Sequence, residues 1–424
     1  MKEISNFAWL SGDKLIKLVL GLIVGIWVAR YLEPVNFGIL TFWLTLLGFF
    51  EVFASFGTQN VVVKKLVEEN NKDQILIGAM VLRLILSFFA AIAFSITSLF
   101  FNSMDIGNTQ LFLVFILFFR FSEIFKYFFE SAVQSKYAAW SESIALTISG
   151  CLKIILILIS ENLDLFFIVA VFEAGLILIL LVYFAKKNFP ETKFLNFEKF
   201  RLKQAYHLVK ESVPFFLASL TVLLYMKIDQ IMVGIFLDPI ELGYYAVAVK
   251  ITEVWYFVPL ALISSFFPKL IKSFLEIDTF NKLISNLFFS LFWISMLASV
   301  LTLFLSEKLI VLLFGTPYLS SAGLLNLYIF SGVLVGLSTL SDRWYQLNNL
   351  SDFIFYKSLW GALINIALNY FLIKLFGVWG AAISTVLTLF ILVYIFDLFS
   401  KKTRPLLLLK VNSLFKLYDF KKIS

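Results

Sequence analysis

Cysteine and histidine are almost absent from this sequence, which has one of each, Cys151 and His207. A lone cysteine excludes an intrachain disulfide, and this pair is too small to build a metal site from cysteine and histidine ligands. Charge is also scarce: 15% of the 424 residues are Asp, Glu, Lys or Arg, against roughly 25% in a typical soluble domain. No phosphate-binding or dinucleotide-binding glycine motif occurs, so neither ATP hydrolysis nor a bound cofactor is expected.

Two further classes are excluded by what the chain lacks. The net charge of +7 comes without any basic run interleaved with exposed aromatics, so the chain is not expected to bind nucleic acid. A membrane glycosyltransferase or polymerase would need a large outer loop for its acid and base. The longest predicted outer loop, 306–320, is short and has Glu307 as its one carboxylate. The chain is therefore not predicted to be an enzyme.

Apolar residues are abundant instead, at 61% of the chain with a mean hydropathy of +0.93. No water-soluble fold has enough interior to hide that much apolar surface. A spanning helix needs about 20 apolar residues, and hydropathy predicts twelve spans, at 8–31, 37–58, 75–101, 109–131, 141–160, 163–185, 212–236, 244–267, 283–305, 321–342, 353–373 and 378–398. The prediction is an all-α polytopic membrane protein.

The longest polar interruption separates six spans from six. We therefore predict an N-terminal lobe at 1–185, a cytoplasmic linker at 186–211, a C-terminal lobe at 212–398, and a basic amphipathic cytoplasmic tail at 399–424. With both termini inside, the inner segments carry 23 Lys and Arg and the outer loops carry two, Lys308 and Lys374. This asymmetry predicts cytoplasmic termini.

An internal repeat agrees with this division. VARYLEPVNFG at 28–38 matches VGIFLDPIELG at 233–243 in its Val, Leu, Pro and Gly, and Pro239 lies 205 residues after Pro34. Because six spans is an even number, the second lobe enters the membrane in the orientation of the first. The arrangement predicted is a parallel repeat of two six-helix lobes around a central cavity, as in alternating-access transporters.

Ten cations fall within predicted spans: Lys14, Lys17, Arg30, Arg83, Arg120, Lys126, Lys153, Lys227, Lys250 and Lys357. Each costs roughly 2.5 to 3.5 kcal/mol at a helix centre. Two explanations of these intramembrane cations require no transported substrate. The long side chain of a cation near the end of a span can extend to the membrane–water interface. This explanation fits Arg30, and for Lys14, Lys153 and Lys357 it is as good as the alternatives. Ion pairs along one helix face are the other explanation, from Asp13 to Lys17, among Arg120, Glu123 and Lys126, and from Lys250 to Glu253.

The functional interpretation is that these cations line a hydrated cavity for an anionic substrate, since Lys and especially Arg bind phosphate. Its candidate substrate-binding residues are Lys17, Arg83, Arg120, Lys126, Lys227 and Lys250, and we take Arg83, Arg120 and Lys227 as the unpaired ones. The main intramembrane acids are Asp13, Glu51, Glu123, Glu142, Glu173, Asp229 and Glu253. The candidates for coupling to H⁺ or Na⁺ are Asp13, Glu51, Glu123 and Asp229.

Three segments carry a family resemblance: WLSGDKLIKLVLGLIVGIWVARYLEPVNFGIL at the start, IDQIMVGIFLDPIELGYYAVAVKI from Ile228, and LLFGTPYLSSAGLLNLY from Leu312 to Tyr328. They resemble the polysaccharide-unit flippases of the multidrug/oligosaccharidyl-lipid/polysaccharide exporter superfamily. The resemblance implies twelve spans in two lobes and a cavity for undecaprenyl-diphosphate-linked sugar units. It carries over Asp229, Gly234, Pro239 and Gly243 as motif residues, structural apart from Asp229.

The expected function is transfer of an undecaprenyl-diphosphate-linked oligosaccharide, such as an O-antigen unit, to the outer leaflet of the bacterial inner membrane. The expected partners are the lipid bilayer, this glycan, a polysaccharide polymerase and a chain-length regulator. Two alternatives stay open. One is a cation-coupled exporter of drugs or small molecules, and the other is a membrane scaffold for glycan assembly that transports nothing.

Overall fold

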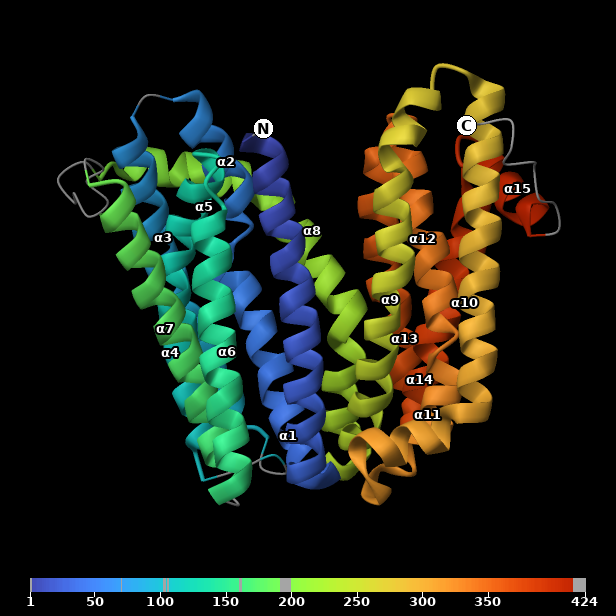
Figure 1. The fold of residues 1–424 in the computed structure, drawn as a ribbon, viewed down its shortest axis with the longest axis horizontal. Helices are drawn as coiled ribbons and strands as arrows, with labels where there is room; N and C mark the ends of the chain where they lie inside the picture. Colours follow the sequence, from blue (N-terminus) through green and yellow to red (C-terminus); the bar gives the residue numbers. More distant parts are fainter. Residues whose placement is uncertain are drawn as a thin grey trace. The chain divides into compact units, whose positions relative to one another are not determined.

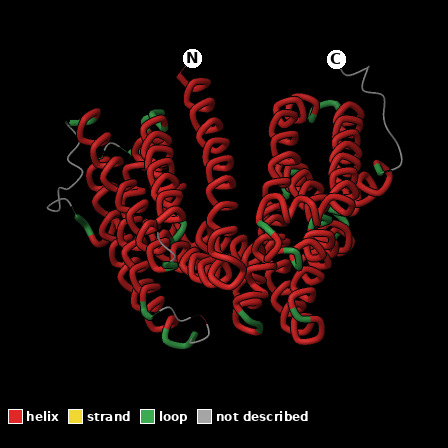
Figure 2. Tube along the Cα trace, turned by 60° about the horizontal axis from the view of Figure 1, so that its bottom comes forward, coloured by secondary structure: helices red, strands yellow, loops and turns green. Residues whose placement is uncertain are grey.

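The computed structural model describes residues 2–69, 71–101, 104, 107–159, 162–190 and 200–414, without the side chains of 2–16 and 18. Every regular element in these ranges is a helix, and no strand occurs in them (Figure 2). Ten of the helices are long and apolar enough to cross a membrane. The predicted all-α polytopic membrane fold is confirmed.

Two features reconcile these ten helices with the twelve predicted spans. The first two spans lie in one continuous element, α1 (Lys2–Ser55), which kinks at Glu33 (φ 58°, ψ 173°). Pro34 explains the kink, because proline removes a backbone donor and forces the preceding residue out of the helical region. The fourth span, 109–131, is broken into a 3₁₀ segment (Thr109–Leu113), α4 (Val114–Phe119), a 3₁₀ turn (Arg120–Ser122) and α5 (Glu123–Ser131).

The chain forms two compact units. The first comprises Met1–Leu32 and Ile39–Leu223. Its helices are most of α1, then α2 (Thr58–Glu68), α3 (Lys72–Ser98), α4, α5, α6 (Lys136–Ile159), α7 (Asp164–Asn188) and the start of α8 (Leu202–Phe236). α6 packs along α7, and α3 and α7 both pack on α4 (Figure 1).

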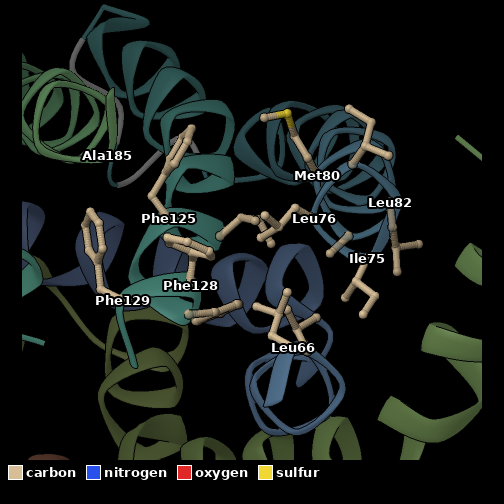
Figure 3. Packing of buried hydrophobic residues seen from close by; sticks show 14 of the residues in the cluster. Leu66, Ile75, Leu76, Met80, Leu82, Phe125, Phe128, Phe129 and Ala185 are labelled. Atoms are coloured by element: carbon tan, nitrogen blue, oxygen red, sulfur yellow. The ribbon is translucent and has the colours of Figure 1, made fainter. Parts of the chain in front are cut away.

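A core at one end of this unit joins α2, α3, α5 and α7. Leu66, Leu76, Phe125 and Phe129 are at most 3% exposed and belong to one cluster of buried side chains (Figure 3). Between helices in lipid, van der Waals packing of this kind supplies much of the attraction. It holds α5 against α3, and both helices carry charged side chains described below.

The second unit comprises Glu33–Gly38 and Leu224–Ser424. It holds the end of α8, then α9 (Pro239–Ser273), α10 (Ile277–Phe314), α11 (Ser321–Tyr328), α12 (Ser331–Leu347), α13 (Ser351–Phe376), α14 (Val378–Phe390) and α15 (Arg404–Ser413). α9 packs on α11 and α12, and α13 packs along α14. A π-helical segment (Ile391–Ile395) and a 3₁₀ turn (Phe396–Phe399) follow α14.

The two copies of the sequence repeat touch each other inside this second unit. A Cβ atom added to Gly38 would lie 1.9 Å from the Pro239 carbonyl oxygen, and one added to Gly243 would lie 2.0 Å from the Pro34 carbonyl oxygen. Each glycine therefore packs on the proline of the other copy. A reciprocal contact of this kind is what a two-fold relation between copies produces, so the geometry supports the predicted duplication.

The predicted linker and tail are only partly described. Residues 191–199 and 415–424 lie outside the described part of the chain, and α8 is helical from Leu202. α15 packs on α10 with Leu406 and Lys410 buried, while Leu408 and Val411 face outward. The Lys410 ammonium donates to Asp397 and to the Val393 carbonyl, each at 2.7 Å. Burial lowers the pKa of Lys410 to about 8, against the opposing effect of Asp397.

Candidate functional site

The first unit contains a network of charged side chains that come from six of its elements. Its longest branch runs through two arginines and two glutamates. Arg120, in the 3₁₀ turn, donates to both oxygens of Glu51 on α1, at 3.2 and 3.4 Å, and to Glu123 at 3.0 Å. Arg83 on α3 donates to the other oxygen of Glu123 at 2.8 Å and to the Tyr127 hydroxyl at 2.6 Å.

A second branch centres on Glu142 of α6. Lys126 of α5 donates to one carboxylate oxygen of Glu142 at 2.7 Å, and Lys17 of α1 donates to the other. A third branch lies on α6 and α7, where Lys153 and the Ser149 hydroxyl both donate to Glu173, at 3.3 and 2.6 Å. The site therefore depends on side chains from helices that are far apart in sequence.

These branches share the wall of one cavity of about 330 Å³ within the first unit. The charged residues in its wall are Glu51, Arg120, Glu123, Glu142, Lys153 and Glu173. Leu44, Phe119 and Ile177 are among the apolar residues beside them. A cavity with charged and apolar walls can admit water and a polar ligand, whereas a charge facing lipid would be costly.

Among the side chains that the structure describes, the cations of the network outnumber its carboxylates by one. Its cations are Lys17, Arg83, Arg120, Lys126 and Lys153, and its carboxylates are Glu51, Glu123, Glu142 and Glu173. Most of these side chains are between 19% and 38% exposed, whereas Arg83 is 2% exposed. Pairing lowers the cost of placing them in a membrane, and partial exposure keeps them within reach of a ligand.

The prediction that Arg83, Arg120 and Lys227 are unpaired is wrong. Arg83 and Arg120 are held by carboxylates as described, and Lys227 donates to Glu253 at 2.7 Å in the second unit. The pair along one helix from Arg120 to Glu123 is confirmed. The other partners lie on different helices, which spacing along one helix does not reveal.

The remaining predicted site residues lie in the second unit or outside the described side chains. Asp229, 2% exposed, accepts hydrogen bonds from the Tyr245 hydroxyl, from Thr385 at 3.2 Å and from the Gln230 backbone at 2.8 Å. The Lys250 ammonium lies 5.7 Å from the centre of the Phe37 ring. The side chain of Asp13 lies outside the described part, although its backbone belongs to α1.

Lys357 and Lys153 each pair with a carboxylate inside their own unit. Lys357 is 4% exposed and donates to Asp342 and to the Ser338 hydroxyl at 3.0 Å. Lys153 pairs with Glu173. For both residues the ion-pair explanation replaces interfacial reach. Among the described residues, no cluster of three or more His, Cys, Asp or Glu could hold a metal ion.

Residues 4–274 match a family model described as "Polysaccharide biosynthesis protein". The match covers more than half of the chain. The chain belongs to this family. The predicted relationship to polysaccharide-unit proteins is thereby confirmed, and the charged cavity of the first unit lies within the matched range. No curated protein sequence matches the chain.

Several solved structures of membrane transporters have a similar fold. The lipid II flippase MurJ in an inward closed conformation is 17% identical with a TM-score of 0.74, over 96% of this chain and 91% of that one. An inward-facing multidrug resistance MATE transporter is 14% identical with a TM-score of 0.73, over 96% and 99%. A MOP superfamily transporter from Pyrococcus furiosus is 14% identical with a TM-score of 0.53, over 95% and 94%. These likenesses establish the fold.

Proposed function

We propose that the protein is a flippase for undecaprenyl-diphosphate-linked oligosaccharides, such as O-antigen units or similar surface polysaccharides. It moves them from the cytoplasmic to the outer leaflet of a bacterial inner membrane, with both of its termini in the cytoplasm. The observation that carries the proposal is the cavity of the first unit, where Arg120 and Lys153 lie beside carboxylates and apolar residues, and where a further cation, Lys126, pairs with Glu142 of the wall. Family membership supplies the link to polysaccharide synthesis.

The chemistry of the site suits a diphosphate headgroup. A guanidinium binds two phosphate oxygens at once, and the fork of Arg120 already holds both oxygens of Glu51 in that geometry. The sugars would occupy the aqueous part of the path while the prenyl chain stays in lipid. Alternating access would then carry the headgroup across.

Carboxylates in the network suggest how transport is coupled. When a phosphate binds the Arg120 guanidinium, the partly buried Glu51 carboxylate loses its ion-pair partner. Glu51 then binds a proton or a cation more readily. Glu123 and, in the second unit, Asp229 are further candidates. A polymerase and a chain-length regulator are the protein partners that such a flippase would supply with substrate.

The second candidate function is cation-coupled export of a drug or small molecule. It is favoured by the MATE fold likeness, whose TM-score of 0.73 nearly equals that of MurJ. A network that already pairs its own cations is also compatible with a passenger that is not strongly anionic.

The test is deletion of the gene in a strain without a second flippase for the same glycan. We expect surface polysaccharide to disappear while lipid-linked repeat units accumulate on the cytoplasmic leaflet. Complementation by Arg120→Gln should fail although the variant is present in the membrane at normal abundance. Normal surface polysaccharide after deletion, with raised sensitivity to drugs, would contradict the flippase proposal and support the exporter.

A further inference from the structure

Helix α15 has its charged side chain inside and apolar side chains outside. On its inward face Lys410 is 1% exposed, beside Leu406 at 0%. Arg404, Leu408 and Val411 follow one another at helical spacing, so they share the opposite face. Leu408 is 63% exposed and Val411 is 43% exposed. A helix that faces water normally turns polar residues outward, so this pattern indicates that something apolar covers the outward face.

The buried lysine fixes which face of α15 points outward. The Lys410 ammonium donates to Asp397 and to the Val393 carbonyl, each at 2.7 Å. The Tyr345 hydroxyl of α12 donates to the same carboxylate. Rotation of α15 about its axis would break this pair and leave the buried Asp397 without its cation, which is costly. The outward face is therefore held outward.

The exposed charges of residues 398–414 are all positive. Lys401 and Lys402 in the turn before α15 and Arg404 in its first turn are exposed, and this stretch contains no Asp or Glu. The preceding carboxylate, Asp397, is 0% exposed. Cations at a helix N-terminus oppose the helix dipole, so these three side chains do not stabilise α15 itself. Their charge suits an anionic partner.

α15 lies against a helix that also has an exposed apolar face. It packs on α10 at the side of the second unit (Figure 1). Trp293 of α10 is 46% exposed, and its indole nitrogen donates to the Leu414 carbonyl at 3.1 Å. Leu297, one turn further along α10, is 61% exposed. Tryptophan is enriched where a membrane meets water, and α10 is long and apolar enough to cross a membrane. α15 therefore lies beside a surface suited to lipid.

We propose that α15 and the turn before it bind anionic phospholipid at the membrane surface. Lys401, Lys402 and Arg404 contact the headgroup phosphates, while Leu408 and Val411 lie among the upper acyl carbons. Lipid accounts for the cations and the outward apolar pair together, whereas water accounts only for the cations. The inference goes beyond the proposed function, since it concerns the lipid around the protein and not a transported substrate.

The first test measures binding of phosphatidylglycerol to the purified full chain in detergent. A fluorescent label on Asn412→Cys, in a Cys151→Ser background, reports lipid arriving at α15. Replacing Lys401, Lys402 and Arg404 together by Gln should weaken the Kd by about a hundredfold, at about fivefold for each cation near an anionic headgroup. Equal affinities of the wild-type surface for phosphatidylglycerol and phosphatidylcholine would overturn the proposal.

The matched control replaces three other exposed cations of the second unit, Lys269, Lys272 and Lys282, by Gln. The change in net charge is the same, but Glu276 and Asp278 lie among these lysines in the sequence, and none of them belongs to α15. The Kd at the Asn412 label should stay within about twofold of its value without these substitutions. Equal weakening by the two triple variants would show a general charge effect and contradict a site at α15.

A double variant guards against a loss of structure. The Arg404 Nε atom donates to the Leu398 carbonyl at 3.0 Å, so replacing Arg404 also removes a contact of α15. Lys401→Gln with Lys402→Gln leaves that bond in place and should still weaken the Kd by about 25-fold. If this double variant binds phosphatidylglycerol as tightly as the wild-type surface, the turn before α15 is not part of a binding site and the proposal falls.

The second test asks what covers the outward face. A spin label on Leu408→Cys, again with Cys151→Ser, should collide with oxygen more often than with a water-soluble nickel chelate in phosphatidylglycerol nanodiscs. The same label on Lys282→Cys, a charged exposed position, should show the opposite order. Free access of the chelate to position 408 would place it in water, and low access of both reagents would place it under protein, such as a second copy. Either result would overturn the proposal, and neither bears on transport.

Discussion

Arg83 illustrates how a buried charge in a membrane can serve structure. Its side chain is 2% exposed, and its guanidinium connects Glu123 and Tyr127 on α5 to α3. Its Nε atom is buried without a hydrogen-bond partner in the structure. Burying a guanidinium costs several kcal/mol unless its partners are in place, and removing it leaves the partner's charge uncompensated. Arg83 therefore orients Glu123, which in turn orients Arg120.

Replacing Arg83 tests this structural role. Arg83→Met should destabilise the protein by about 3 to 5 kcal/mol, because Glu123 loses a buried partner. Tyr127→Phe removes one hydrogen bond and should cost only about 0.5 to 1.5 kcal/mol. Thermal unfolding of both variants in the same detergent checks the order. Equal stabilities of Arg83→Met and Tyr127→Phe would show that Arg83 contributes little to holding Glu123.

At this scale the sequence could predict which residue types matter but not how they pair. The spacing of Arg120 and Glu123 along one helix indicates their ion pair, and the structure contains it. Glu51 lies 69 residues from Arg120, and Lys17 lies 125 residues from Glu142. Pairs of this kind depend on which helices pack together, and hydropathy carries no information on that. This is why Arg83 and Arg120 were predicted to be unpaired.

At the scale of elements, Gly38 and Gly243 each contact the proline of the other repeat copy, and this reciprocal contact packs the Glu33–Gly38 segment on the start of α9 within the second unit. A side chain at Gly38 would overlap the Pro239 carbonyl, and one at Gly243 would overlap the Pro34 carbonyl. Both neighbours are backbone atoms, which cannot rotate away as a flexible side chain can. The sequence repeat predicted the likeness of these segments, but only the structure places them in contact.

Alanine at either glycine should therefore separate the two segments. Gly38→Ala and Gly243→Ala should each destabilise the protein by at least about 1 to 3 kcal/mol, as overpacking does in a close-packed core. Gly48→Ala on α1 is the control, since nothing lies within 4 Å of its added Cβ, and it should gain up to about 1 kcal/mol from helix propensity. Thermal unfolding measures all three, and an unchanged midpoint for Gly38→Ala would refute the contact.

The docking of α15 depends on a buried ion pair. Lys410 and Asp397 are 1% and 0% exposed, and Asp397 also accepts a hydrogen bond from Tyr345. At pH 6.5, below its pKa of about 8, Lys410 is charged and fully paired. The amphipathic tail predicted from the sequence has the right composition, but its leucines alone do not show that its lysine points inward.

A double-mutant cycle at pH 6.5 measures what this pair contributes. Lys410→Met alone should weaken the docking of α15 by about 3 to 5 kcal/mol, because the buried Asp397 loses its cationic partner. Lys410→Met with Asp397→Asn should recover most of that loss, since an apolar replacement of a buried pair is often neutral. Hydrogen exchange of the α15 amides reports docking. A double variant as weakly protected as the single one would show that the two charges are not coupled.

Across the whole molecule, the fold is duplicated while the charged cavity is not. At the shift that aligns Pro34 with Pro239, the positions matching Arg83, Arg120 and Glu123 are Phe288, Leu325 and Tyr328. Hydropathy predicted the all-α polytopic fold well, because crossing a membrane constrains length and apolarity in every segment. The site follows no such general constraint, so the second copy was free to lose it or the first to acquire it.

The orientation of the molecule in its membrane is the remaining prediction. With both termini placed inside, the predicted inner segments carry 23 Lys and Arg against two in the predicted outer loops, and this asymmetry predicts cytoplasmic termini. In a Cys151→Ser background, Lys308→Cys should react with a membrane-impermeant maleimide on intact spheroplasts, and Lys203→Cys should react only after lysis. Both lysines are exposed, Lys203 near the start of α8 and Lys308 near the end of α10. The reverse pattern would invert the topology, and with it the direction in which a cytoplasmic lipid-linked glycan could enter.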